Sequence, residues 1–299
     1  RADRLQPVMQ EAYRLAYIRK PEFMGNTRTE EKDPKFKVIS DLPWCEQEIN
    51  ERLAAYRQLS DKVEQEWHAL PAQKKETYFQ LVKYPVQAAA QMNNKLLTAQ
   101  LARHGKADWA DSDRAYDSIV SLTKTYNTTK WNRMMDFQPR RLLVFNRVER
   151  KALSSGLLEK PQAVYTWNGA DCVEGASVIC EGLGYEGKAV AVEKKKELTF
   201  EFAAWETDSV EVEVRLLPNH PVEGERLRFT ISLDGSATEA VSYETKGRSE
   251  EWKENVLCNQ AVRRMILPVA RKASHRLIFT ALDEGVVLDQ IYLYTPRIK

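Results

Sequence analysis

Two groups of side chains in this 299-residue sequence could contact a ligand. In the first, Trp167, Asn168 and Asp171 combine an indole ring with an amide and a carboxylate. A sugar stacks its apolar CH face on tryptophan, while its hydroxyl groups bond amides and carboxylates, so this mixture is typical of a carbohydrate contact. Trp167 could equally lock the first strand of a β-domain to its core.

The second group lies in the stretch KWNRMMDFQP at 130–139, which should be a loop. Trp131, Asn132 and Arg133 place an aromatic ring beside hydrogen-bonding groups, and loops held by a rigid scaffold often carry function. We treat these three residues as further candidate carbohydrate contacts. The alternative is that the loop packs one domain against another.

Trp252 and Asp289 are predicted to be structural. Trp252 should anchor a short helix, and Asp289 lies in an apolar strand, VVLDQI at 286–291, where it would bond a neighbouring loop or, alternatively, a sugar. The sequence contains no GxSxG, HExxH, Walker or GxGxxG motif in a suitable context, and no identifiable pair of catalytic carboxylates. We therefore predict no catalytic residue, no metal and no cofactor.

Charge and composition restrict the partners. The net charge is only +2, so nucleic acid is a poor candidate, and no apolar run is long enough to span a membrane. The four cysteines form no CxxC pair, which does not favour structural zinc. Cys172 and Cys180 could meet across neighbouring strands or remain free thiols.

Apolar spacing divides the chain into two halves. Up to about residue 150, apolar residues recur every three or four positions, most clearly between Ile49 and Leu70, which predicts an antiparallel helical bundle. Pro85 should kink or restart one helix. From about Tyr165 the spacing becomes two, and Asp234-Gly235 is a hairpin signal, so the second half predicts an antiparallel, jelly-roll-like β-sandwich. The fold class is α+β in two domains.

Six segments carry a resemblance to a known family. They are YIRKPE at 17–22, YFQLVKYPV at 78–86 with Met92-Asn93, KWNRMM at 130–135, ISLDG at 231–235, EWKENVL at 251–257 and DEGVVLDQI at 283–291. Together they resemble the C-terminal part of glycoside hydrolase family 115, the xylan α-1,2-glucuronidases. The resemblance extends over nearly the whole chain. It implies that residues 1–40 are a final barrel-type helix and connecting loop. The spacing predicts the other domains: a helical bundle at 41–150, a linker at 151–162 and a β-sandwich at 163–299.

The resemblance also implies a parent enzyme whose catalytic barrel lies outside this chain. The chain would then supply accessory modules of an α-glucuronidase acting on glucuronoxylan: a scaffold, oligomer contacts that include a homodimer, and part of the cleft rim. It would be inactive alone. Its partners would be the barrel and acidic xylan or xylo-oligosaccharide, in the periplasm or outside the cell.

Two alternatives stay open from the sequence. The sandwich could be a carbohydrate-binding module, or the chain could be a structural dimerisation unit without sugar binding. A start inside a helix, at Arg1, favours a piece of a longer protein.

Overall fold

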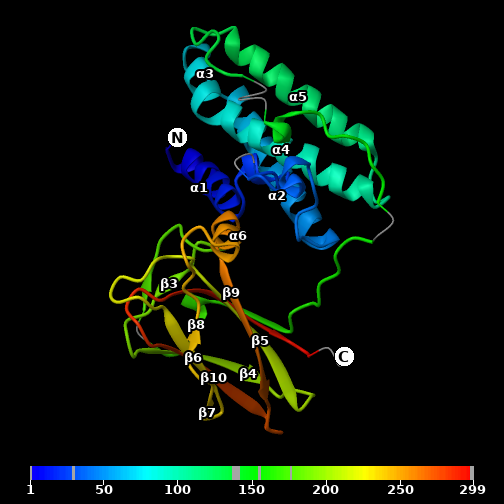
Figure 1. Cartoon of the computed structure of the whole chain (residues 1–299). Coiled ribbons are helices and arrows are strands. Elements are labelled where there is room, and N and C mark those ends of the chain that lie inside the picture. Colours follow the sequence, from blue (N-terminus) through cyan, green and yellow to red (C-terminus); the bar gives the residue numbers. More distant parts are fainter. Residues whose placement is uncertain (1, 29–30, 137–141, 154–155, 176, 297–299) are drawn as a thin grey trace. The chain divides into compact units, whose positions relative to one another are not determined.

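The computed structural model describes the chain except for residues 1, 29–30, 137–141, 154–155, 176 and 297–299. It contains two compact units, Arg1–Lys160 and Pro161–Lys299 (Figure 1). The first unit is helical, and the second consists of two antiparallel sheets. The predicted fold class, a helical bundle followed by an antiparallel β-sandwich, is confirmed.

The helical unit is organised around one central helix. α4 (Tyr84–Arg103) packs against α2 (Glu46–His68) and α5 (Trp109–Asn127), and α1 (Ala2–Ile18) packs against α2. Most of the second half of α4 is buried, which fits its central position. Short helical turns complete the described part of the unit: α3 (Ala72–Tyr78), η1 (Pro21–Phe23), η2 (Pro34–Lys37) and η5 (Leu143–Phe145).

The interruption predicted at Pro85 takes the form of a π-helical turn. The chain stays helical from α3 into α4, but Phe79–Lys83 (η3) form a wider turn in which the Tyr84 N–H donates to the Phe79 carbonyl. Pro85 follows directly, and because it has no N–H to donate into the preceding turn, the wider turn lies where the regular helical hydrogen bonding is interrupted. Leu81 lies in the π turn and is exposed, whereas its neighbour Val82 is buried.

The second unit packs two antiparallel sheets face to face. One sheet has the order β2-β3-β11-β5-β9, with β1 also paired to β11, and the other has the order β4-β10-β6-β7, with β8 paired to β6. The strands are β1 (Tyr165–Asn168), β2 (Val178–Ile179), β3 (Val190–Ala191), β4 (Glu197–Ala203), β5 (Ser209–Leu216), β6 (Arg228–Leu233), β7 (Ser236–Ala237), β8 (Val241–Ser242), β9 (Ala261–Pro268), β10 (Ser274–Ala281) and β11 (Val287–Tyr294).

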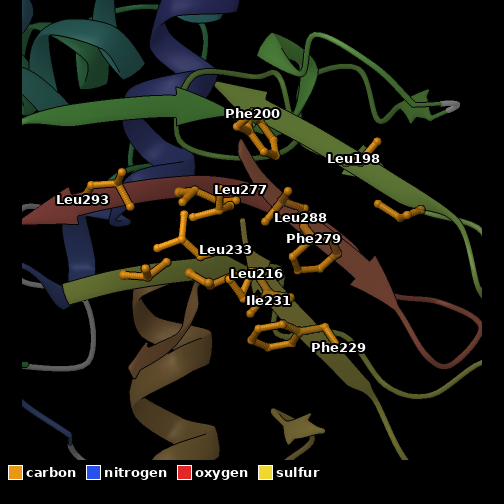
Figure 2. Packing of buried hydrophobic residues seen from close by; sticks show 14 of the residues in the cluster. Leu198, Phe200, Leu216, Phe229, Ile231, Leu233, Leu277, Phe279, Leu288 and Leu293 are labelled. Atoms are coloured by element: carbon orange, nitrogen blue, oxygen red, sulfur yellow. The ribbon is translucent and has the colours of Figure 1, made fainter. Parts of the chain in front are cut away.

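Alternating side chains from both sheets fill the sandwich core. Phe200 of β4, Phe279 of β10 and Leu293 of β11 are fully buried and converge between the sheets (Figure 2). Asp234 and Gly235 both have positive φ, 52° and 92°, as a two-residue hairpin turn between β6 and β7 requires. A helix, α6 (Glu250–Cys258), connects β8 to β9.

Cys172 and Cys180 are free thiols, as are Cys45 and Cys258. None of the helices in the described part of the chain has the length and apolar character needed to cross a membrane.

Candidate functional site

A small polar pocket lies on the outer face of the six-stranded sheet. Its volume is about 270 Å³. On β1 the side chains alternate, so that Tyr165 and Trp167 pack against the core while Thr166 and Asn168 face outward. β11 presents Gln290 and Tyr292 on the same outer face, because the two strands pair Asn168 with Gln290 and Thr166 with Tyr292. The lining residues are Thr166, Trp167, Asn168, Glu186, Gln290 and Tyr292.

A chain of hydrogen bonds orders the polar groups at this pocket. Asp171 accepts from both the backbone N–H and the side-chain amide of Asn168, each at 2.9 Å. The Asn168 amide oxygen then accepts from Gln290 at 3.2 Å, and the Gln290 amide oxygen accepts from the Tyr292 hydroxyl at 3.3 Å. Since each group fixes the next, the pocket presents preorganised amide and hydroxyl groups to a ligand.

Among the predicted contacts, only Trp167 and Asn168 line this pocket, and they do so differently. The Trp167 ring stacks on Tyr165 and contacts Phe200, with ring centroids 5.6 Å apart in both pairs. Its indole thus packs β1 against the core. Asp171 lies in η6 (Gly169–Asp171), where it caps the turn and orients Asn168.

Beside the pocket, a buried carboxylate lies between two guanidinium groups. Glu213 is bonded by Arg215 at 2.6 Å and by Arg264 at 2.7 Å. Burial would raise the pKa of Glu213, but the two arginines outweigh burial and hold the pKa below its usual value. Arg215 also stacks on Tyr292, with its guanidinium carbon 3.8 Å from the ring centroid. The Arg215 guanidinium is therefore held in place by Glu213 on one side and by the Tyr292 ring on the other.

Asp289 holds the loop that brings Glu186 to the pocket. Its carboxylate accepts from the Tyr185 N–H at 3.0 Å and from the Gln260 amide at 2.8 Å. Burial raises its pKa, while these two hydrogen bonds oppose the rise. Asp289 therefore bonds a neighbouring loop and is fully buried. Trp252, the other structural candidate, donates its backbone N–H to Ser249 at the start of α6.

Trp131, Asn132 and Arg133 belong to the helical unit, in a turn after α5. The Asn127 side chain bonds both the N–H and the carbonyl of Met135, at 3.3 and 2.9 Å, which closes the turn. Arg133 has φ +63°, and Trp131 is 40% exposed. Residues 137–139, the end of the predicted motif, lie outside the described part of the chain.

Sequence reasoning missed Thr166, Glu186, Gln290 and Tyr292. The alternation Gln290-Ile291-Tyr292 in β11 shows that two polar side chains share a face, but only the pairing of β1 with β11 places them beside Asn168. Glu186 lies in a loop, and its approach to the pocket depends on the contact between the neighbouring Tyr185 and Asp289.

The pocket does not have the composition of a glycosidase active site. Glu186 is the one carboxylate in its lining, whereas an inverting glycosidase needs an acid and a base roughly 6.5–9.5 Å apart. Within the described residues, no cluster of three or more His, Cys, Asp or Glu side chains is arranged to hold a metal ion. The described chain thus combines a helical bundle with a β-sandwich that carries a small polar pocket on its outer face.

Comparison with known proteins gives the family. Residues 176–299 match the family described as the glycosyl hydrolase family 115 C-terminal domain. A solved structure described as a novel family GH115 4-O-methyl-α-glucuronidase, with specificity for decorated arabinogalactans, is 61% identical, with a TM-score of 0.96, over 99% of this chain and 39% of that chain. The chain thus represents the C-terminal region of family 115, and the resemblance seen in the sequence is confirmed.

Other solved structures are far more distant. A carbohydrate-binding module from the Cellvibrio mixtus lichenase 5A, in complex with cellotriose, is 13% identical, with a TM-score of 0.33, over 46% of this chain and 100% of that chain. A family 35 module from Clostridium thermocellum is 11% identical, with a TM-score of 0.35, over 44% of this chain and 98% of that chain. These likenesses are too weak to indicate a ligand. No curated protein matched the sequence.

Proposed function

We propose that this chain is the C-terminal accessory part of a family 115 α-glucuronidase. The observation that carries the proposal is the match to a 4-O-methyl-α-glucuronidase over 99% of this chain, which includes both units and spans 39% of that relative. The chain would act as a scaffold for a catalytic barrel supplied by the remaining part of such an enzyme, and would provide oligomer contacts, including those of a homodimer. The enzyme would work outside the cytoplasm, where its polysaccharide is found.

The same relative supports a proposal for the substrate. The sequence-based prediction was glucuronoxylan, but the relative is described as specific for decorated arabinogalactans, at 61% identity. We therefore propose that the parent enzyme removes 4-O-methyl-glucuronic acid, or glucuronic acid, from arabinogalactan. Glucuronoxylan is the alternative substrate, and a comparison of the parent enzyme's activity on the two polysaccharides would distinguish them.

The scaffold role predicts a physical association. The part of the 61%-identical relative that this chain does not match would be produced with and without this chain. We expect the two pieces to co-purify and the catalytic piece to be more soluble and more active in the complex. A fully active catalytic piece that does not bind the chain would contradict the scaffold role.

A second function, sugar contact by the sandwich, is favoured by the ordered amides of the outer pocket. We expect isothermal titration calorimetry to detect weak binding of glucuronic-acid-decorated oligosaccharides, with Kd on the order of 1 mM. Asn168→Ala should weaken binding by about tenfold, the equivalent of ~1.4 kcal/mol for one lost hydrogen bond.

The matched control is Glu201→Ala, an exposed position on the other sheet, which should leave the affinity unchanged. Binding that is the same in Asn168→Ala and in the control would exclude this pocket. Trp167→Ala is a poorer test because Trp167 packs against the core.

A further inference from the structure

The helical unit contains a second cavity, larger than the sandwich pocket, at the end where α5 terminates. Its volume is about 480 Å³, which is in the range of small-molecule sites. Its walls come from the end of α2, from α3 and the π turn, from α4 and from the last turn of α5. The lining residues are Trp67, Glu76, Phe79, Lys83, Gln87, Leu122, Thr125, Thr128 and Thr129.

One wall is aromatic and held rigidly. Trp67 and Phe79 have ring centroids 6.0 Å apart, and Phe79 in turn contacts Tyr84 and Tyr126, each at 6.1 Å. The π turn places Phe79, a residue of η3, in this wall. π turns inside helices occur frequently at functional sites because they displace side chains from the regular helical positions. A ligand with an apolar face would find a preformed surface here.

The opposite wall offers hydrogen-bond acceptors. Thr125, Thr128 and Thr129 donate their hydroxyl protons to backbone carbonyls of α5, at 3.0, 2.7 and 2.7 Å. A hydroxyl that has donated its proton still has lone pairs, but the Thr129 oxygen already accepts from the Trp131 N–H at 3.2 Å, so Thr125 and Thr128 present the acceptors. The Glu76 carboxylate adds further acceptor atoms to the lining. The ligand must therefore bring donors.

The charges in and around the cavity are balanced, because Lys83 pairs with Glu64. Lys75, whose ammonium lies 5.1 Å from the centroid of the Trp67 ring, offsets Glu76. Lys83 bonds Glu64 at 2.7 Å, and the Gln87 amide donates to the same carboxylate at 2.9 Å, so Glu64 fixes both side chains in the wall. The Lys83 ammonium lies 4.5 Å from the centroid of the Trp67 ring. Since an ammonium has three donors, Lys83 can also donate to a ligand oxygen. A balanced cavity rich in acceptors favours a neutral ligand over an anion.

An apolar face, several hydroxyl donors and no net charge together describe one chemical class. We infer that this cavity binds a neutral pyranose sugar, such as an unsubstituted residue of the polysaccharide chain. The site is separate from the sandwich pocket; the choice of a polysaccharide residue as its source of sugar rests on the proposed function, whereas binding of a free neutral sugar tests the cavity by itself. Glucuronate, which is anionic, should bind more weakly.

The test uses the full chain with methyl β-D-galactopyranoside, xylobiose and sodium glucuronate as probes. We expect saturation-transfer NMR signals from a neutral sugar, with Kd on the order of 1 mM by calorimetry, and about tenfold weaker binding of glucuronate. Thr125→Trp fills the cavity from an exposed helical position, so it should weaken neutral-sugar binding by about tenfold or more without unfolding the unit. Lys124→Trp, also exposed but outside the lining, is the matched control and should leave binding within roughly twofold.

Gln87→Leu gives a second, independent variant, because it replaces the amide in the wall with an apolar side chain of similar size; it should also weaken binding. Absence of binding of either neutral sugar at about 10 mM would overturn the inference. Binding that is equal in Thr125→Trp and Lys124→Trp would also overturn it, since it would place the sugar at another site.

Discussion

Replacing Gly184 with alanine should destabilise the sandwich by about 3 kcal/mol, the sum of a left-handed backbone and an overpacked contact. Gly184 has φ +91°, and an added Cβ would overlap the Asp289 carboxylate and lie 2.9 Å from the Ala189 Cβ. Asp289 is fully buried and cannot withdraw, so the loop must move. Because Glu186 lies two residues further on, the same change should also open the sandwich pocket.

Gly182 provides the matched control for this prediction. It has φ +75° in the same loop, but an added Cβ there would meet nothing within 4 Å. Gly182→Ala should therefore cost only the backbone strain, about 1 kcal/mol. Urea unfolding, with hydrogen exchange of peptides from β11 as the readout for the sandwich, measures both variants. Equal losses would show that Asp289 does not hold the loop in the described way.

The helical unit should become more stable between pH 7 and pH 9.5, by about 3 kcal/mol from Lys95 alone. Lys95 is fully buried, and its ammonium donates to the carbonyls of Val144 and Asn146 at 2.5 and 2.8 Å. Burial lowers its pKa from 10.5 to about 7. Between the two pKa values the unfolded chain binds more protons than the folded one, so the free energy of unfolding rises with pH in this window and becomes independent of pH below the folded pKa.

Lys95→Met isolates the contribution of this residue. The variant cannot titrate at position 95. From pH 7 to pH 9.5 the unmodified protein should therefore gain about 3 kcal/mol of unfolding free energy relative to Lys95→Met. Chemical unfolding at both pH values, with hydrogen exchange of α4 peptides, measures it. An exposed lysine, Lys62, gives the control: Lys62→Met should show a constant difference. A constant difference for Lys95→Met as well would mean that its ammonium is not desolvated.

The periodicity of apolar residues was sufficient to predict the two folds, because the face that a helix or strand buries sets the spacing of its apolar residues. Apolar residues spaced three or four apart between Ile49 and Leu70 indicate a helix that buries one face. The structure has this helix as α2, Glu46–His68. The alternation around Phe229 and Ile231 likewise required a strand with one buried face, as β6 shows. The shortest strands, β2, β7 and β8, have two residues each and leave no such pattern.

The candidate sites were harder to predict because they depend on register and not on composition. Asn168 could be singled out from its neighbours in sequence, but Gln290 is 122 positions away and reaches it only through the pairing of β1 with β11. The same limit applies to the helical cavity. In the sequence Trp67 belongs to an apolar stripe, whereas its place in the same cavity wall as Thr128 depends on the packing of separate helices.

The most direct measurement of the central claim is an assay of the purified chain against arabinogalactan and glucuronoxylan, each carrying 4-O-methyl-glucuronic acid, with anion-exchange chromatography to detect the released acid. If the chain is an accessory part that leaves the chemistry to a separate barrel, neither polysaccharide will lose its uronic acid, even after long incubation at high protein concentration. Sustained release above a boiled-protein control would contradict the account, because it would place a complete acid–base pair within these two domains.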